Sequence, residues 1–423
     1  MQHIVKIGKK SLRTDFGLIL ILLLMFATSC FALYNCFNLM REGTGQYYLN
    51  RQIMWYAIGF LVMFVIHTLG NKIVYRYLDP FYNFLLVILV YLLASKLLFR
   101  LTGHTLPLAA PVNGAYSWLQ IPLLGSFQAS EFMKVCLIIK SASIISDFQK
   151  NGPLTNSKTT MGMLLAIGRW AIPPMILVLL QPDTGLFIIT AFTLMLMVMC
   201  SGIPARYVIT LIAILVGVIG LLFYLFFFHL DFLASFVSQY QLNRIEAWLH
   251  PDDYILGSSN QLYTALLSLG SAGLTGHGLQ ANIISIPEAY TDFIFAAFGQ
   301  CFGLLGTIYI LIICLVLDIY LCKMAYNLKD LESKLIIIGT IAMLFYQQFQ
   351  NLGMIVGLVP ITGITLPLIS YGGSSTLSYF ILFGIILNIS PTSSKVLRLF
   401  AFKKRKASRP KRLRRKRVKK TMA

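Results

Sequence analysis

Long runs of apolar residues, separated by short polar stretches, dominate the pattern along this chain. Runs near or above about 18 residues recur from one end to the other, which is typical of helices that cross a lipid bilayer. A helix satisfies its own main-chain hydrogen bonds within lipid. We therefore predict an all-α, polytopic membrane protein with about ten transmembrane helices, at residues 17–37, 53–70, 79–97, 129–147, 164–181, 184–201, 207–229, 293–321, 335–356 and 373–390.

The composition supports this fold class. Of the 423 residues, 57% are hydrophobic and 12% are charged, which is too little polar surface for a soluble domain of this size. The apolar run 17–37 is long enough to remain as a span, so we predict no cleaved signal peptide. The seven cysteines form no CxxC pair, and we interpret them as packing residues rather than as disulfides or metal ligands.

The charges are distributed very unevenly. Residues 391–423 carry 15 of the 35 Lys and Arg and no acidic residue. In a membrane protein we interpret this tail as a cytoplasmic anchor on anionic lipid, in preference to a nucleic-acid site. Basic residues also favour the loops on the side of the termini, which predicts that both termini are cytoplasmic. The predicted regions are a basic N-terminus (1–16), a membrane domain (17–390) and the tail (391–423).

Three loops are then predicted to face outward: 98–128, 230–292 and 357–372. The second is the longest and lies between the seventh and eighth spans. Long loops held by a rigid scaffold are common places for function. The candidate chemistry is therefore expected on this outer side.

Asp292 is the first candidate, because it directly precedes an apolar span. At this position it is either a helix N-cap, which its location alone favours, or a carboxylate placed at the membrane boundary as a general base. The two roles are compatible only if one carboxylate oxygen stays free.

Other ionisable residues lie at or near predicted spans. Glu131 and Lys134 share one helix face, and the choice between a mutually neutralised pair and a functional pair is open. Asp183 follows a Gln-Pro pair and is more easily interpreted as a turn residue than as a carboxylate in a cavity. The six histidines show no metal-ligand spacing.

Two outer segments have further alternatives. Arg244 belongs to a stretch with Trp248 that fits an amphipathic helix on the membrane surface, and its sharper partner would be an anionic head group. Gly372 and Gly373 open the last span. Their composition favours close helix packing, whereas exposed N–H groups there could bind a diphosphate.

Taken together, these segments resemble the SEDS family (shape, elongation, division and sporulation), typified by RodA, FtsW and SpoVE. The resemblance covers nearly the whole chain. It is carried by the stretches Pro287–Phe295, Pro360–Gly363, Leu366–Ser375, Gln181–Gly185, Asn113–Lys134 and Arg244–Pro251. The chain departs from the family pattern at Tyr290, Gln300 and Cys301, among others, where the family commonly has His and a pair of Glu.

The resemblance implies a peptidoglycan glycosyltransferase in the bacterial cytoplasmic membrane, used in cell elongation, division or sporulation. Such an enzyme polymerises lipid II, releases undecaprenyl diphosphate with inversion, and works with a class B penicillin-binding protein. Asp292 would be the catalytic carboxylate. The predicted substrate-binding residues are Lys134, Glu131, Arg244, Gln128, Ser130, Asp183, Ser370, Gly372, Gly373 and Ser374.

No sequence motif marks a metal site, although a divalent cation (Mg²⁺ or Mn²⁺) would suit a departing diphosphate. Two other functions fit the same pattern. A transporter that flips lipid II would also need a lipid-facing cavity with embedded charges. A non-catalytic scaffold of the cell-wall synthesis complex would tolerate the missing acidic pair.

Overall fold

The computed structural model describes residues 4–7, 10–111, 115–122, 125–154, 156–234, 239–250 and 260–389. The basic tail predicted to bind anionic lipid lies outside these residues. So do Asn113, Gly114 and Pro251, which belong to stretches that carry the family resemblance.

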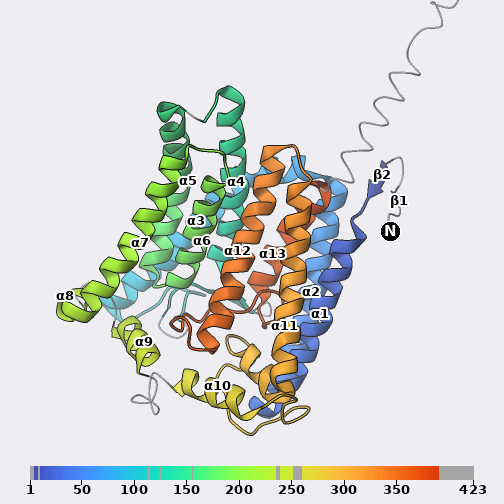
Figure 1. The fold of residues 1–423 in the computed structure, drawn as a ribbon, viewed down its shortest axis with the longest axis vertical. Helices are drawn as coiled ribbons and strands as arrows, with labels where there is room; N and C mark the ends of the chain where they lie inside the picture. The colour runs from blue at the N-terminus through green and yellow to red at the C-terminus, as the bar shows by residue number, and fades with distance from the viewer. Residues whose placement is uncertain are drawn as a thin grey trace, which may run out of the picture.

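Each predicted span coincides with a helix in the described part of the chain. The ten helices are α1 (Phe16–Asn35), α2 (Thr44–Leu69), α3 (Asn71–Thr102), α4 (Ala129–Asn151), α5 (Ser157–Leu180), α6 (Thr184–Met199), α7 (Ala205–Phe228), α11 (Ile294–Tyr326), α12 (Leu331–Ile355) and α13 (Gly373–Ile389). Figure 1 shows them as one bundle with roughly aligned axes. The predicted fold class, an all-α polytopic membrane protein, is confirmed.

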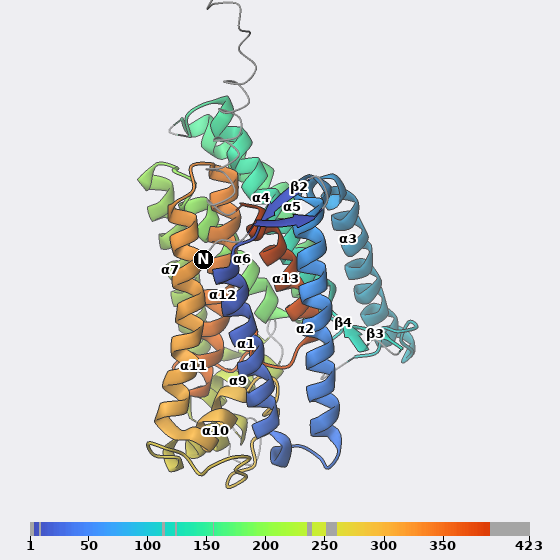
Figure 2. The same ribbon diagram turned by 90° about the vertical axis from the view of Figure 1, so that its right-hand side faces the viewer.

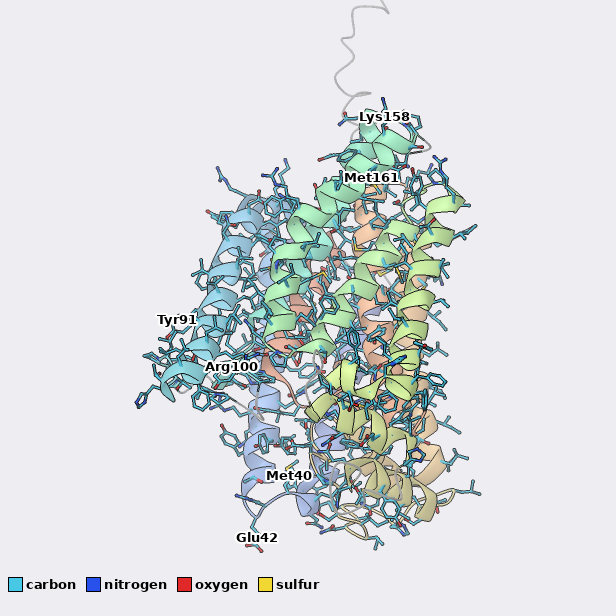
Figure 3. All side chains as sticks on the ribbon, turned by 90° about the vertical axis from the view of Figure 1, so that its left-hand side faces the viewer. Met40, Glu42, Tyr91, Arg100, Lys158 and Met161 are labelled. Atoms are coloured by element: carbon cyan, nitrogen blue, oxygen red, sulfur yellow. The ribbon has the colours of Figure 1, made fainter. Side chains whose placement is uncertain are left out.

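Seven of these helices are long and apolar enough to cross a membrane: α1, α2, α3, α5, α7, α11 and α12. The helices α6 and α13 are apolar but shorter, and α4 carries Glu131, Lys134 and Lys140 among its apolar residues. The count of ten spans therefore stays a prediction. Cytoplasmic termini also stay a prediction, although Figure 3 places Lys158 and Glu42 at opposite ends of the bundle, as that orientation requires.

Several predicted helix ends are wrong. The helix α2 begins at Thr44 rather than 53, and α5 begins at Ser157 rather than 164. Residues 71–78, predicted as a connecting loop, form the first turns of α3. Hydropathy marks the part of a helix that lies in lipid, whereas a helix with polar residues can continue beyond it.

Short strands and helices accompany the ten long helices. The hairpin of β1 (Ile4–Ile7) and β2 (Lys10–Arg13) lies at one end, while α9 (Gln239–Leu249) and α10 (Asn260–Ser271) lie at the other (Figures 1 and 2). The remaining elements are η1 (Phe37–Leu39), β3 (Leu119–Ile121), β4 (Gly125–Phe127) and α8 (Leu230–Ala234). The strands β3 and β4 pair antiparallel. The predicted amphipathic helix around Arg244 is α9.

Glycines allow the inner helices to approach closely. On α2, a methyl group at Gly59 would lie against the ring of Phe380 of α13. On α12, a methyl group at Gly339 would meet Met197 of α6 and Ile138 of α4. Because membrane helices gain no hydrophobic force from lipid, such small-residue contacts are a main source of their packing energy.

The helix α11 is interrupted at Gly303, which has φ 61° and ψ −151°. The segment 273–278 takes up the hydrogen bonds that the break releases. The main-chain nitrogens of residues 277 and 278 donate to the oxygens of residues 300 and 301, each at 3.0 Å. The nitrogens of residues 304 and 305 donate to the oxygens of residues 273 and 274. These hydrogen bonds join the segment 273–278 to the break in α11.

The helix α7 lies at the edge of the bundle (Figure 1). None of its residues is buried, and most of its side chains are apolar and exposed. It therefore presents nearly its whole surface to the surrounding lipid.

Candidate functional site

Asp292 lies in the turn that leads into α11. The main-chain nitrogens of Thr291 and Phe293 both donate to the oxygen of Glu288, at 3.1 and 3.2 Å. Phe293 is the N-cap residue of α11, and no side chain caps this helix. The alternative prediction that Asp292 is the helix N-cap is therefore wrong. Its half-buried carboxylate accepts no hydrogen bond from any residue that the structure describes, so both oxygens are available for chemistry.

Arg244 is the cation nearest this carboxylate, and the two side chains meet at Gly363. A methyl group added to Gly363 would lie 3.3 Å from Asp292 Oδ2 and 3.8 Å from each terminal nitrogen of Arg244. Arg244 also donates from Nη1 to the main-chain oxygen of Ile361 at 3.2 Å. Gly363 has φ +72°, a conformation that favours glycine. Its bare Cα therefore lets a carboxylate and a guanidinium approach the same point.

The surroundings of Asp292 make its carboxyl group a weaker acid. Burial, and to a smaller extent the negative charge of Glu288, raise the pKa of Asp292 to about 6. The guanidinium of Arg244 opposes both effects. A carboxyl group whose pKa lies near 6 can accept a proton at neutral pH more readily than an ordinary one, which suits a general base.

Asn351 of α12 links the Asp292 turn to the loop 357–372. Its Nδ2 lies 2.7 Å from the main-chain oxygens of both Asp292 and Ile364. The neighbouring Gln350 donates to the main-chain oxygen of Pro360 at 3.0 Å. On the outer side, Trp248 Nε1 donates to the main-chain oxygen of Gly357 at 2.8 Å. The loop 357–372 is thus fixed by α12 and by α9.

Asp183 is the N-cap residue of α6, and its carboxylate also contacts Gln128, the N-cap residue of α4. Its Oδ1 accepts a hydrogen bond from Leu186 N at 3.3 Å, so Asp183 caps this helix. Its Oδ2 accepts from Gln128 Nε2 at 2.8 Å, and Gln128 N donates to Ser374 Oγ at 3.1 Å. Burial raises the pKa of Asp183 to about 6, despite the hydrogen bonds from Leu186 and Gln128. The predicted residues 128, 183 and 374 therefore form one cluster.

Gly185 brings this cluster to the same loop that carries Gly363. A methyl group at Gly185 would lie 3.1 Å from Cγ1 of Ile364 and 3.8 Å from the main-chain oxygen of Thr362. The first turn of α6, which Asp183 caps, and Asp292 therefore both approach the segment 361–365.

Glu131 and Lys134 form a buried ion pair. Lys134 Nζ lies 2.5 Å from Glu131 Oε2, and their side chains are 2% and 7% exposed. Ser378 donates to the same carboxylate oxygen at 3.3 Å, and the ammonium lies 5.0 Å from the ring centre of Tyr379. The positive charge of Lys134 lowers the pKa of Asp183, whereas it is not among the charges that act on Asp292. The prediction of a neutralised pair describes this geometry, and Lys134 is not brought next to Asp292.

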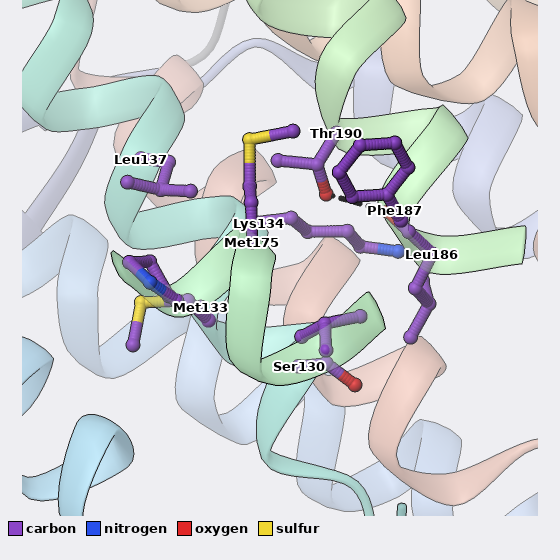
Figure 4. A pocket seen from close by; sticks show the side chains of 10 residues that line it. Ser130, Met133, Lys134, Leu137, Met175, Leu186, Phe187 and Thr190 are labelled. Atoms are coloured by element: carbon purple, nitrogen blue, oxygen red, sulfur yellow. Dashed lines mark hydrogen bonds between the residues drawn. The ribbon is translucent and has the colours of Figure 1, made fainter. Parts of the chain in front are cut away.

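A small cavity of about 10 Å³ opens beside Lys134, between α4, α5 and α6 (Figure 4). This is room for about one water molecule. Ser130 lines the cavity, and its hydroxyl group is buried without a hydrogen-bond partner among the described residues. The rest of the lining is mainly apolar, including Met175 and Phe187. Ser130 therefore faces this cavity rather than Asp292.

The predicted glycine segment serves packing and main-chain order. Gly372 N donates to Gln52 Oε1 at 3.3 Å, and a methyl group at Gly373 would collide with the ring of Trp55. Ser370 is buried, and its hydroxyl accepts from Leu366 N at 2.9 Å. The N–H group of Gly372 therefore has a protein partner, and packing accounts for Gly373.

Sequence reasoning missed Asn351, Gln52 and Gly363 as residues of the site. Asn351 lies in the predicted span 335–356 together with Gln347, Gln348 and Gln350. Four amide side chains in one apolar run were a signal, because polar groups within a membrane are costly unless they have a structural or functional role.

The described side chains at the site do not form a complete set of ligands for a divalent cation, and such a cation stays an expectation. Asp292 supplies one carboxylate and has the guanidinium of Arg244 beside it, whereas Mg²⁺ needs several oxygen ligands. The described residues contain no group of three His, Cys, Asp or Glu side chains that could bind a metal ion.

The sequence of this chain is similar to a known protein family and to several of its members. The family described as "Cell cycle protein", which covers FtsW, RodA and SpoVE, matches residues 13–395. The probable peptidoglycan glycosyltransferase FtsW of Lactococcus lactis is 33% identical, over 72% of this chain and 75% of its own. Stage V sporulation protein E of Bacillus subtilis is 30% identical, over 90% of this chain and 98% of its own.

Solved structures show the same fold. A chain from a structure titled "Structural coordination of polymerization and crosslinking by a peptidoglycan synthase complex" matches with a TM-score of 0.68 and 24% identity, over 89% of this chain and 97% of that chain. The rod-shape-determining protein RodA of Thermus thermophilus matches with a TM-score of 0.60 and 23% identity, over 89% of this chain and 96% of that chain.

Proposed function

The chain belongs to the FtsW, RodA and SpoVE family of cell cycle proteins, and on that premise we propose that it is a peptidoglycan glycosyltransferase. It is a multi-pass protein of the bacterial cytoplasmic membrane and polymerises lipid II into glycan strands at the outer face. The printed names of relatives that align with most of the chain support this activity.

One observation supports Asp292 as the general base. Its carboxylate lies directly before α11, is half-buried, and accepts no hydrogen bond from the residues that the structure describes, with Arg244 as a neighbouring cation. A base must be ionised and reachable by the hydroxyl group from which it takes a proton. A carboxyl group with a pKa of about 6, packed against Gly363 of the loop 357–372, supports this role.

The proposed step is a single displacement at the anomeric carbon. The 4-hydroxyl oxygen of the N-acetylglucosamine on one lipid-linked disaccharide attacks C1 of the N-acetylmuramic acid on another. A new C–O bond forms as the bond from C1 to the diphosphate oxygen breaks, and the configuration inverts. The hydroxyl proton passes to Asp292, and undecaprenyl diphosphate leaves with the electron pair.

Arg244 is the group that we assign to the leaving diphosphate. Its guanidinium shares the Gly363 contact with Asp292, so nucleophile and leaving group would each have a protein partner on one site. A fixed cation near a developing anion stabilises the transition state more than a mobile one. We give Lys134 no direct role in this step, because its ammonium group is paired with Glu131 inside the bundle.

A partner is also part of the proposal. The neighbour of highest fold similarity named above comes from a peptidoglycan synthase complex that couples polymerisation to cross-linking. We propose that this chain likewise works with a class B penicillin-binding protein, which cross-links the strands that it makes.

The test is polymerisation of purified lipid II by the full chain, with its penicillin-binding partner added. Asp292→Asn should lower the rate by about 10²-fold or more, since general-base catalysis contributes roughly that much. Glu42→Gln is the matched control, because Glu42 is an exposed carboxylate at the end of the bundle opposite Lys158 and should leave the rate unchanged (Figure 3).

The outcomes separate the proposed enzyme from its alternatives. Full polymerisation by Asp292→Asn would remove the general-base role. Translocation of lipid II across vesicles without any polymer would favour a transporter. No polymer, no translocation and normal assembly of the partner complex would favour a scaffold.

A further inference from the structure

Three tyrosines from distant parts of the chain meet around the turn that carries the proposed base. Tyr48 comes from the first turns of α2, Tyr290 from the turn before α11, and Tyr371 from the loop before α13. The rings of Tyr48 and Tyr290 are stacked, with centroids 4.3 Å apart. The ring of Tyr371 meets Tyr48 edge-on at 4.9 Å. We call these three residues the tyrosine cluster.

Main-chain hydrogen bonds hold the cluster in place. The nitrogen of Tyr371 donates to the oxygen of Tyr290 at 3.0 Å. Gln52, one turn along α2 from Tyr48, accepts from Gly372 N at 3.3 Å and donates to the oxygen of Ser370 at 3.1 Å. The rings are therefore positioned before any ligand arrives, which lowers the entropic cost of binding.

The cluster is not fully occupied by its own contacts. All three tyrosines are half-buried, and the neighbouring Tyr47 is 52% exposed, with the guanidinium of Arg51 5.2 Å from its ring centre. Tyrosines that only anchor a helix at the membrane surface point outward to lipid. These three instead converge from α2 and from the segments before α11 and α13, and Tyr290 is two residues before Asp292.

Such a surface suits a sugar ring. A pyranose with equatorial substituents presents a face of C–H groups, and the electron-rich face of an aromatic ring attracts C–H hydrogens. Sites for small ligands are usually lined by apolar and aromatic side chains with a few polar groups among them.

We propose, building on the glycosyltransferase function above, that the tyrosine cluster is a stacking surface for an N-acetylhexosamine ring, which it holds next to Asp292. The ring belongs either to lipid II or to the growing strand, and the two sources share this chemistry. The cluster positions the sugar and takes no part in proton transfer.

The first arm of the test measures binding of a soluble β-1,4-linked N-acetylglucosamine tetramer, which mimics the strand, by calorimetry on full-length Asp292→Asn protein. Tyr48→Leu should weaken binding by about 3–10-fold, the range expected for one aromatic contact. Tyr48→Phe and Tyr48→Trp keep an aromatic face and should bind as the parent does. Tyr326→Leu, which changes an exposed tyrosine at the far end of α11, is the control.

The second arm measures the KM for lipid II in the otherwise native enzyme. A higher KM in Tyr48→Leu with unchanged tetramer binding assigns the ring to lipid II, whereas weaker tetramer binding assigns it to the strand. Unchanged values in both arms overturn the inference, and so does an equal loss in Tyr48→Phe, which would point to the hydroxyl group. Thermal melting of each variant, with Tyr48→Trp as the conservative one, identifies any loss due to misfolding.

The two proposals fail separately. If Asp292→Asn polymerises lipid II normally, the general-base role is lost, while the effect of Tyr48→Leu on sugar binding still decides the role of the cluster. If substitutions in the tyrosine cluster leave sugar binding unchanged, the proposal for the cluster fails, but the proposed glycosyltransferase function is not affected.

Discussion

The side-chain nitrogen of Asn351 lies 2.7 Å from the main-chain oxygen of Asp292. The same nitrogen lies 2.7 Å from the main-chain oxygen of Ile364, one residue beyond the glycine against which the Asp292 carboxylate packs. One amide group deep in α12 thus sets the distance between the proposed base and the loop that faces it.

Replacing Asn351 tests this arrangement. Asn351→Leu leaves a buried carbonyl group at Ile364 and a partly buried one at Asp292 without their donor, at up to about 1–3 kcal/mol each. We expect a lower melting temperature in detergent and a lower kcat for lipid II polymerisation. The control is Asn282→Leu, which removes a hydrogen bond to the main-chain oxygen of Asn38 in an exposed part of the outer loop. Equal losses in both variants would argue against a special role for Asn351.

The pH dependence of polymerisation should report the charges around Asp292. Its pKa is raised to about 6, and only the ionised form can accept a proton, so the rate should rise with pH through about 6. Glu288 raises this pKa, so Glu288→Gln should move the midpoint to lower pH. Arg244 lowers it, so Arg244→Gln should move the midpoint to higher pH and also slow the reaction. Stopped assays across pH 4.5–8.5 (an estimated range around that pKa) check both directions, and shifts of opposite sign would refute the assignment.

Gly363→Ala should weaken catalysis through crowding. A methyl group there would lie 3.3 Å from Asp292 Oδ2 and would sit at a φ of +72°, which costs a non-glycine residue about 1–2 kcal/mol. Gly43→Ala is the matched control, since Gly43 has φ +76° and open space around it. Both variants should lose similar stability, and only Gly363→Ala should lose activity, by roughly 10-fold or more. Equal activities would mean that the contact is not needed.

The buried ion pair predicts a non-additive pair of substitutions. Glu131→Gln leaves the Lys134 ammonium group buried and unpaired, which costs about 3–5 kcal/mol. Adding Lys134→Met removes the stranded charge and should restore most of the melting temperature. Thermal melting of the two single variants and the double variant measures the coupling. Simple addition of the two losses would contradict a direct pair.

The sequence predicted the existence of the helices better than their ends. Apolar runs identify the lipid-facing length, so every predicted span falls on a helix. The first turns of α3 contain Asn71, Lys72 and Arg76 and lack that signal, although they are helical. Ends outside lipid depend on capping and on neighbouring segments, which hydropathy does not record.

The candidate site was only partly predictable. Asp292 and Arg244 stood out as isolated charges beside apolar segments, but nothing local indicates that residues 244, 292 and 363 meet. That convergence depends on how α9, α11 and the loop 357–372 pack, which is a long-range property. Gln128, Asp183 and Ser374 were predicted one by one and proved to be hydrogen-bonded to each other.

The exposed surface of α7 has a consequence for how this protein is handled. A helix with no fully buried residue is held by few packing contacts, so its tilt responds more readily to the thickness of the surrounding hydrocarbon layer. Since α8 and α9 follow α7 along the chain, bilayer thickness acts on the segment that carries Arg244. Lipids of different acyl-chain length should therefore tune the enzyme, and micelles of different detergents should not be treated as equivalent solvents for its assay.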